Sequence, residues 1–239
     1  MALLELREVS RSFGGLRAVS RLSFAVQPGE ILGLIGPNGA GKTTVFNLVT
    51  GFVRPSSGEV LLDGRRLRAG RPHAVTALGV ARTFQVVKPF PRLSARENVT
   101  LAAFLRHRAR RDAEARAAEA LARVGLAART EVLACDLTLM EQRRLELARA
   151  LATEPRLLLL DEPMGGLTPP EVDAASELVL ALRAAGLTIV VVEHVMKAIM
   201  RISDRVVVMH HGEKIADGRP AEVVRDAAVV AAYFGTRRA

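Results

Sequence analysis

A glycine-rich segment with a single lysine, GPNGAGKTT at residues 36–44, has the composition of a phosphate-binding loop. It fits the spacing G-x-x-x-x-G-K-[ST], in which backbone N–H groups curl around phosphate oxygens. An apolar strand precedes it and a helix is expected from Lys42, a context that argues against a plain glycine-rich turn. Lys42 is expected to reach the β- and γ-phosphates of a nucleotide, and the Thr43 hydroxyl to bind Mg²⁺. The expected nucleotide-binding residues of this segment are Gly36, Pro37, Asn38, Gly39, Ala40, Gly41, Lys42, Thr43 and Thr44.

Two acidic residues, Asp161 and Glu162, end the leucine-rich run RLLLLDEP at residues 156–163. A run of leucines indicates a strand buried on both faces, and ligands of open parallel sheets bind at the carboxyl ends of such strands. Asp161 is placed to support Mg²⁺, and Glu162 to orient or deprotonate an attacking water. A helix cap is the alternative role for this pair. Together with the phosphate-binding segment, the pair predicts a nucleotide hydrolase.

The elements that must position these residues alternate between strands and helices. Strands are expected at 2–9, 22–27, 30–36, 156–163 and 187–194, with short strands in EVLLDG and ARTFQ and a hairpin over 205–218. Helices are expected from Lys42, across 94–129, at 140–152 and 170–185, from Val195, and twice near the end. This alternation predicts an α/β fold with a parallel central sheet, with the helical middle as an insertion.

Composition limits the classes of function. The chain has 239 residues, 49% of them hydrophobic, enough to bury a sizeable core. Its formal charge of +9 permits an anionic partner, but aromatic residues are only 4% and Trp is absent, so a nucleic-acid groove with stacking aromatics is not expected. The single cysteine, Cys135, suits a reducing compartment and is expected to be a small buried residue.

The sequence shows neither a signal peptide nor a membrane span. Glu5, Arg7 and Glu8 come too early for a signal peptide, and no run approaches the roughly 20 apolar residues of a spanning helix. The chain is therefore expected to be soluble and cytoplasmic, with docking on a membrane protein left open.

Three further segments narrow the class of hydrolase. Gln85 in ARTFQ, the continuation DEPMGGLTP, and His194 in VVVEH stand in the order seen in ABC-type ATPases. The chain resembles the ATP-binding subunit of an ABC transporter over essentially its whole length. It is most similar to the branched-chain amino acid uptake group in the segments RSFGGLRAV, ARTFQ, RRLELARAL, EHVMKAIMRISDRVVVMHHGEKIADGRP and AAYFG.

The resemblance implies a fold and a division of the chain. The fold is a P-loop NTPase of ABC type, with a parallel-sheet core, an antiparallel β subdomain and a helical subdomain. Residues 1–85 and 154–239 are expected to form the ATP-binding core with the β subdomain, and residues from about 86 to 153 the helical subdomain, all within one ABC ATPase domain.

The resemblance also implies roles for individual residues. Phe13 would stack on the adenine of ATP, and Gln85 would sense the γ-phosphate and Mg²⁺ and relay to the membrane subunit. Glu162 would be the catalytic base and His194 the γ-phosphate contact, with Thr43, Gln85 and Asp161 around Mg²⁺. Each has an alternative, since Phe13 could be a core aromatic, Gln85 a surface residue and His194 a structural histidine.

The segment LTLME at residues 137–141 occupies the position of the Leu-Ser-Gly-Gly-Gln signature that faces the ATP of a head-to-tail partner in ABC ATPases. Both glycines are missing, but Thr138 and Glu141 form the pattern of a helix capping box. We expect Thr138 and Met140 to keep a phosphate contact, weaker because the Met140 side chain must turn aside. A capped helix without nucleotide contact is the alternative. The expected buried face of this helix is Leu145, Ala148, Leu151 and Ala152.

Two other positions depart from the family pattern. Thr168 stands where many relatives have Asp or Asn. Whether this loop signals across the interface between two ATPase subunits is therefore left open. Val195 follows His194 where Asp is common, which removes a possible N-cap acceptor.

The implied function is ATP hydrolysis in an ABC importer for branched-chain amino acids or related small polar substrates. The implied partners are membrane permease subunits, a second ATPase subunit and, indirectly, an extracellular or periplasmic substrate-binding protein, and the implied place is the cytoplasmic face of the inner membrane. The rivals are a lipopolysaccharide-export ATPase, which shares the RRLELARAL type of helix, and a non-transport ABC ATPase acting on nucleic acid. The spacing between Gln85 and Leu137 leaves no room for the long insertions typical of the latter, so a nucleic-acid partner is not expected.

Overall fold

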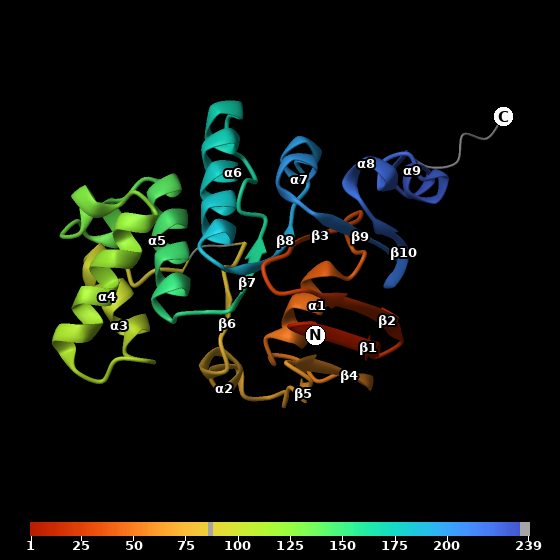
Figure 1. Cartoon of the computed structure of the whole chain (residues 1–239), viewed down its shortest axis with the longest axis horizontal. Coiled ribbons are helices and arrows are strands. Elements are labelled where there is room, and N and C mark those ends of the chain that lie inside the picture. Colours follow the sequence, from red (N-terminus) through yellow and green to blue (C-terminus); the bar gives the residue numbers. More distant parts are fainter. Residues whose placement is uncertain (86–87, 235–239) are drawn as a thin grey trace. The chain divides into compact units, whose positions relative to one another are not determined.

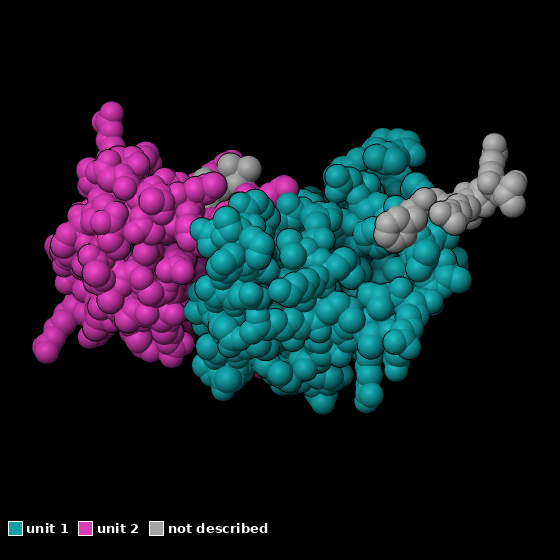
Figure 2. All heavy atoms as spheres, turned by 90° about the horizontal axis from the view of Figure 1, so that it is seen from above, with its two compact units in different colours: residues 1–75, 159–239 teal, residues 76–158 magenta. Residues whose placement is uncertain are grey.

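The computed structural model describes residues 1–85 and 88–234. The chain divides into two compact units, and Figure 2 colours them separately. Unit 1 comprises residues 1–75 and 159–239, and unit 2 comprises residues 76–158. The boundaries predicted from the sequence, at residues 85 and 154, differ from these by ten and five residues, and they stay a prediction about domains.

An antiparallel sheet in the order β2-β1-β4-β5 forms one part of unit 1 (Figure 1). Its strands are β1 (Leu4–Phe13), β2 (Leu16–Val26), β4 (Ser57–Leu62) and β5 (Arg65–Arg66). β1 and β2 continue through most of RSFGGLRAVS, the segment between the strands expected at 2–9 and 22–27, and only the two residues between Phe13 and Leu16 lie outside the strands. The strands extend this far because Val9, Val19 and Leu22 are fully buried, with register shifts that absorb the irregular pattern.

The second sheet of unit 1 is mostly parallel, in the order β10-β9-β3-β8-β7. Its strands are β3 (Ile31–Ile35), β7 (Leu157–Asp161, the first two residues in unit 2), β8 (Thr188–Val192), β9 (Arg205–His210) and β10 (Glu213–Gly218). β3 pairs in parallel with β8 and with β9, and β9 with β10 forms the predicted hairpin. Every residue of β3, β7 and β8 is buried, as continuous apolar runs predict. The predicted parallel core is confirmed.

The helices of unit 1 pack apolar stripes inward. They are α1 (Lys42–Val49), α6 (Pro169–Ala184), α7 (Met196–Ile202), α8 (Pro220–Val223) and α9 (Ala227–Phe234), with α2 (Pro72–Ala77) across the boundary between the units. α6 buries Val172, Ser176, Val179 and Leu182, a spacing of three and four residues that matches the helical period. Among the described residues, no helix is both long and apolar enough to cross a bilayer.

Unit 2 contains the helical middle of the chain. It has β6 (Val80–Arg82), α3 (Ala95–Ala103), α4 (Arg110–Arg123), α5 (Leu139–Ala152) and two 3₁₀ turns, Ala127–Arg129 and Ala134–Asp136. The helical stretch predicted at 94–129 is two helices separated by residues 104–109. Ser94 begins the first with a capping box, in which its hydroxyl accepts from Glu97 N and its own N–H donates to the Glu97 carboxylate. α4 packs through small buried alanines, Ala113, Ala117 and Ala120.

Cys135 is exposed, and the expectation that it is buried is wrong. It lies in the 3₁₀ turn Ala134–Asp136, where Ala134 is fully buried and Leu137, just after the turn, is 4% exposed. These two neighbours take the interior positions, so the cysteine between them faces solvent.

Candidate functional site

The glycine-rich segment connects β3 to α1 and is shaped by close backbone contacts. At Gly36 the φ angle is 152°, and a Cβ there would lie 2.1 Å from the Met209 carbonyl oxygen. At Gly41 φ is 103°, and a Cβ would lie 2.3 Å from the Ala18 carbonyl oxygen. Only glycine fits at these two positions, for both steric and conformational reasons. The loop is also tied to the β9–β10 hairpin, since Gly212 N donates to Ala40 O over 3.1 Å.

Lys42 begins α1, and its side chain folds back along the loop. It is 6% exposed, and its ammonium donates to the carbonyls of Gly36 at 2.6 Å and Pro37 at 3.0 Å. Burial lowers the pKa of Lys42, while the nearby carboxylates of Glu162 and Asp161 act in the opposite direction. The side chain is thus a partly desolvated donor in the field of two acids, a setting in which a phosphate oxygen is a strong partner.

Asp161 and Glu162 stand at the end of β7. Asp161 is 5% exposed as the last residue of the strand. Glu162 adopts a positive φ of 49°, which costs a residue with a side chain of order 1–3 kcal/mol. Its N–H donates to Val192 O at 2.9 Å on the neighbouring strand β8. The left-handed turn redirects the chain immediately after the strand, and the Glu162 side chain remains partly exposed.

The imidazole of His194 lies against Glu162, with Nε2 2.9 Å from Oε1. His194 follows β8, and both side chains are partly exposed. The two residues come from adjacent strands, β7 and β8, so the sheet order explains the contact. A carboxylate and an imidazole at this distance can position a water and an anionic oxygen on one accessible surface.

Glu193 anchors both loops at this edge and was not singled out from the sequence. Its side chain accepts three backbone N–H bonds: Oε1 from Met164 at 2.6 Å, and Oε2 from His194 at 2.8 Å and Val195 at 3.1 Å. Glu193 is 1% exposed. Val195 has no side-chain acceptor to cap the start of α7, and Glu193 accepts from the backbone N–H groups there instead. The sequence signal that could have identified Glu193 is an acidic residue at the end of an apolar strand, directly before His194.

Phe13 ends β1 beside the turn to β2. Its side chain is 44% exposed, so the alternative of a core aromatic is excluded. The guanidinium carbon of Arg11 lies 4.5 Å from the ring centroid, which places a cation over one face of the ring.

A second residue missed from the sequence is Tyr233 in α9. Burial raises the pKa of Tyr233, and the nearby backbone of Gly36 works against that rise, so the last helix lies beside the first glycine of the loop.

The remaining site candidates belong to unit 2. Gln85 is exposed and comes three residues after the end of β6. Thr138 caps α5 as predicted: its hydroxyl accepts from Glu141 N at 3.3 Å, and its N–H donates to the Glu141 carboxylate at 2.9 Å. These hydrogen bonds and the adjacent Arg129 hold the pKa of Glu141 below its usual range. Met140 is half-buried. The predicted buried face of α5 is confirmed for Leu145, Ala148, Leu151 and Ala152.

Thr168, the other position flagged as a departure, begins α6. Both its N–H and its hydroxyl contact the Glu171 carboxylate, at 2.8 and 2.7 Å. Thr168 is therefore the N-cap residue of α6.

Unit 1 brings four of the predicted residues to one edge of its parallel sheet. Lys42 follows β3, His194 follows β8, and Asp161 and Glu162 end β7, and these three strands are neighbours in that order. Residues 19–165 match the profile of the family described as ABC transporter. The chain belongs to the ABC transporter family. Residues 213–239 of this ABC cassette also match the profile described as branched-chain amino acid ATP-binding cassette transporter.

Curated relatives of the cassette match it over nearly its full length. It is 39% identical to the high-affinity branched-chain amino acid transport ATP-binding protein BraF of Pseudomonas aeruginosa, over 98% of each chain. It is also 39% identical to LivG of Escherichia coli K12, which has the same description, again over 98% of each chain. This full-length match favours amino acid uptake over lipopolysaccharide export or action on nucleic acid.

Solved structures agree with the fold. A nucleotide-free ATP-binding cassette from an ABC transporter has a TM-score of 0.89 and 27% identity, over 98% of this chain and all of the other. The ADP conformation of such a cassette gives the same TM-score and identity. The predicted P-loop fold of ABC type is confirmed, and the protein is an ABC ATPase.

Proposed function

We propose that this ABC ATPase energises the import of branched-chain amino acids or related small polar substrates. The observation that carries the proposal is the 39% identity to two branched-chain amino acid transport ATP-binding proteins over 98% of each chain. The match at residues 213–239 to the branched-chain amino acid profile supports it independently.

The experiment is reconstitution with membrane permease subunits and a substrate-binding protein of a branched-chain amino acid importer from the same organism. We expect ATP turnover to rise when the binding protein carries leucine, isoleucine or valine, and labelled substrate to enter the vesicles only with ATP. Stimulation by nucleic acid instead, or no response to any of these amino acids, would reject the proposed transport role.

The proposed partners follow from the same likeness. They are membrane permease subunits and a second ATPase subunit, either another copy or a paralogue, with the binding protein acting through the permease. The proposed place is peripheral, on the cytoplasmic face of the membrane. No nucleic-acid partner is proposed.

The proposed chemistry is phosphoryl transfer from ATP to water, in which positioning and electrostatics dominate. Glu162 would take the proton from the attacking water, since its carboxylate is accessible at the edge of the sheet. His194, 2.9 Å from that carboxylate, would contact the γ-phosphate. Lys42 would leave the loop carbonyls that it now contacts and donate to β- and γ-phosphate oxygens. The backbone N–H groups of residues 38–44 would surround the phosphates.

Mg²⁺ would be held by Thr43, Asp161 and Gln85, together with phosphate oxygens. All three offer oxygen donors, which this ion prefers, and it keeps several waters and needs few protein ligands. Thr43 is exposed beside Lys42, and Asp161 contributes to the field at Lys42, so these two donors of unit 1 suit the ion. When bound, Mg²⁺ neutralises charge on the phosphates.

Replacing Phe13 by alanine is expected to weaken ATP binding about tenfold, because an aromatic ring contributes roughly 1–3 kcal/mol by stacking on a base. Arg11 already covers one ring face, so the adenine would use the other. The measurement is the Kd of ATP by calorimetry, with Leu16→Ala, another exposed apolar side chain at the same turn, as the control. Equal affinities for the wild type and Phe13→Ala would remove the adenine contact.

The altered signature is proposed to keep a phosphate contact through the start of α5. Thr138→Ala is expected to lower ATP turnover of the assembled complex several-fold, because it removes the cap that fixes the helix N-terminus, worth about 1 kcal/mol. Met140→Gly is expected to change turnover as well, since it removes the side chain that limits approach to the phosphate.

ATP turnover of the two variants is measured in the assembled complex, with Leu101→Ala as the control, because Leu101 is a 48% exposed leucine of α3 in the same unit and lies outside residues 137–141. If neither Thr138→Ala nor Met140→Gly alters the rate by even a few-fold, α5 is only a capped helix.

A further inference from the structure

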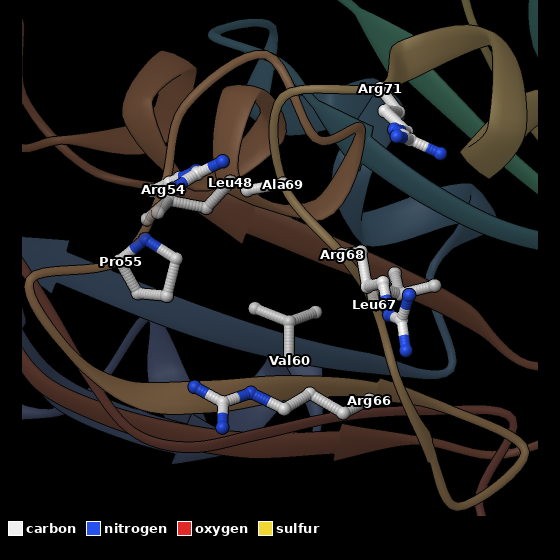
Figure 3. A pocket seen from close by; sticks show the side chains of 9 residues that line it. All are labelled: Leu48, Arg54, Pro55, Val60, Arg66, Leu67, Arg68, Ala69 and Arg71. Atoms are coloured by element: carbon white, nitrogen blue, oxygen red, sulfur yellow. The ribbon is translucent and has the colours of Figure 1, made fainter.

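A cavity of about 670 Å³ in unit 1 lies away from the phosphate-binding loop and is rimmed by arginines. Arg54 follows α1, Arg66 is in β5, and Arg68 and Arg71 lie on the segment that leads to α2. Figure 3 shows Val60 of β4 at the centre, with Arg54, Arg66 and Arg68 on different sides of it. We name this site the arginine pocket. All four guanidinium-bearing side chains are exposed.

The charge of the arginine pocket is not balanced within the part of the chain that the structure describes. No acidic residue is among its described lining residues. None of the four arginines forms an ion pair or a side-chain hydrogen bond with another described residue. Four positive charges around one cavity repel each other, so a bound anion would relieve that repulsion.

A second cavity in the same unit provides a comparison. Its lining includes Arg183, Arg205 and Arg219, but also Glu30, Asp204 and Glu222. Arg183 pairs with Asp204 at 2.9 Å, and Arg205 with Glu30 at 2.8 Å. Arg183 and Arg205 of the second cavity are thus paired with carboxylates that line the same cavity, whereas the four arginines of the arginine pocket have no such partner among the described residues.

The floor of the arginine pocket is apolar. Leu48, Val60 and Leu67 are buried side chains that line it, and Pro55 and Ala69 complete it. A simple inorganic anion would use only the rim. An organic ligand would bury its carbon skeleton on the floor while its charged groups reach the guanidinium groups.

We propose that the arginine pocket is a regulatory or accessory site for an organic ligand that carries two or more phosphate groups. Guanidinium groups bind phosphate oxygens in a bidentate geometry. A phosphate monoester carries a charge of about −1.5 to −2 at neutral pH, so two of them match four arginines. The phosphates can belong to a soluble metabolite or to a lipid headgroup, and both sources share this chemistry.

The first arm of the test titrates fructose 1,6-bisphosphate into the full-length protein by calorimetry, with saturating ADP and Mg²⁺ so that the phosphate-binding loop is filled. At an ionic strength of about 0.15 M we expect a Kd below about 1 mM. The double variant Arg66→Ala/Arg68→Ala should weaken binding at least about tenfold, since it removes two of the four charges. Arg54→Ala/Arg71→Ala provides a second, independent pair if the first melts at a lower temperature than the wild type.

Arg65→Ala is the matched control, because Arg65 is the exposed neighbour of Arg66 in β5 and does not line the pocket. It should change the Kd by less than about twofold. The second arm measures co-sedimentation with vesicles of phosphatidylcholine and cardiolipin, a lipid whose headgroup carries two phosphate groups. Vesicle binding that the double variants lose, without binding of the bisphosphate, assigns the phosphates to a lipid headgroup. Binding of neither probe overturns the proposal, and so does an equal loss in Arg65→Ala and the double variants.

Discussion

Glu162→Gln is expected to lower ATP turnover by at least about 100-fold while ATP binding is retained. The substitution keeps the shape of the side chain and removes the group proposed to take the proton of the attacking water, and general base catalysis contributes typically 10²–10⁴-fold. The amide can still contact His194, which lies 2.9 Å from the carboxylate in the wild type. Turnover is measured in the reconstituted complex, and binding by calorimetry on the isolated subunit.

Glu213→Gln is the control for this substitution, because Glu213 is an exposed carboxylate of β10 in the same unit. It should leave turnover within about twofold, in keeping with the small effect of most surface substitutions. Normal turnover in Glu162→Gln would refute Glu162 as the base. Loss of ATP binding in the same variant would show instead that the side chain holds the loop in place.

Glu193→Gln is expected to lower both the stability of the protein and its turnover. The wild-type carboxylate accepts from three backbone N–H groups, of Met164, His194 and Val195. A glutamine has one oxygen, so its NH₂ group must face at least one of these donors. A buried N–H left without an acceptor costs about 1–3 kcal/mol. Because the same bonds hold the loop of His194, we also expect turnover to fall about tenfold, as small misplacements of catalytic groups are costly.

Two measurements separate the structural from the positioning effect of Glu193. Chemical denaturation gives the change in the free energy of unfolding, and turnover at saturating ATP, well below the unfolding temperature, gives the effect on the folded enzyme. Glu177→Gln is the control, since the side chain of Glu177 is 63% exposed and pairs with Arg201 at the surface of unit 1. A destabilised variant with normal turnover would mean that Glu193 only supports the fold.

The strands of the parallel sheet could be predicted because a strand that is buried on both faces has a near-continuous apolar sequence. Residues 156–163 and 187–194 are near-continuous apolar runs, and β7 and β8 lie inside them. The same principle placed Asp161, Glu162 and His194 at the carboxyl ends of these strands, where the fold has them. The antiparallel strands were harder: β1 and β2 are half-exposed and irregular in register, so the strands expected at 2–9 and 22–27 are shorter than those in the structure.

What the sequence left unresolved depends on conformation and on contacts between distant segments. The positive φ of Glu162 has no signal in its residue type. Cys135 was misassigned because a three-residue helix is too short to fix which side faces inward. The arginine pocket was also not predicted, because its arginines come from separate elements and only the fold brings them around one cavity.

The proximity of Tyr233 to Gly36 has a practical consequence for the use of this protein. α9 lies near the end of the chain, so a peptide fused there is tethered close to the residue that begins the phosphate-binding loop. At the other terminus, Met1 is 95% exposed. Purification handles and fluorescent labels therefore belong before Met1, because a handle at the far end risks altering the nucleotide affinity it was added to measure.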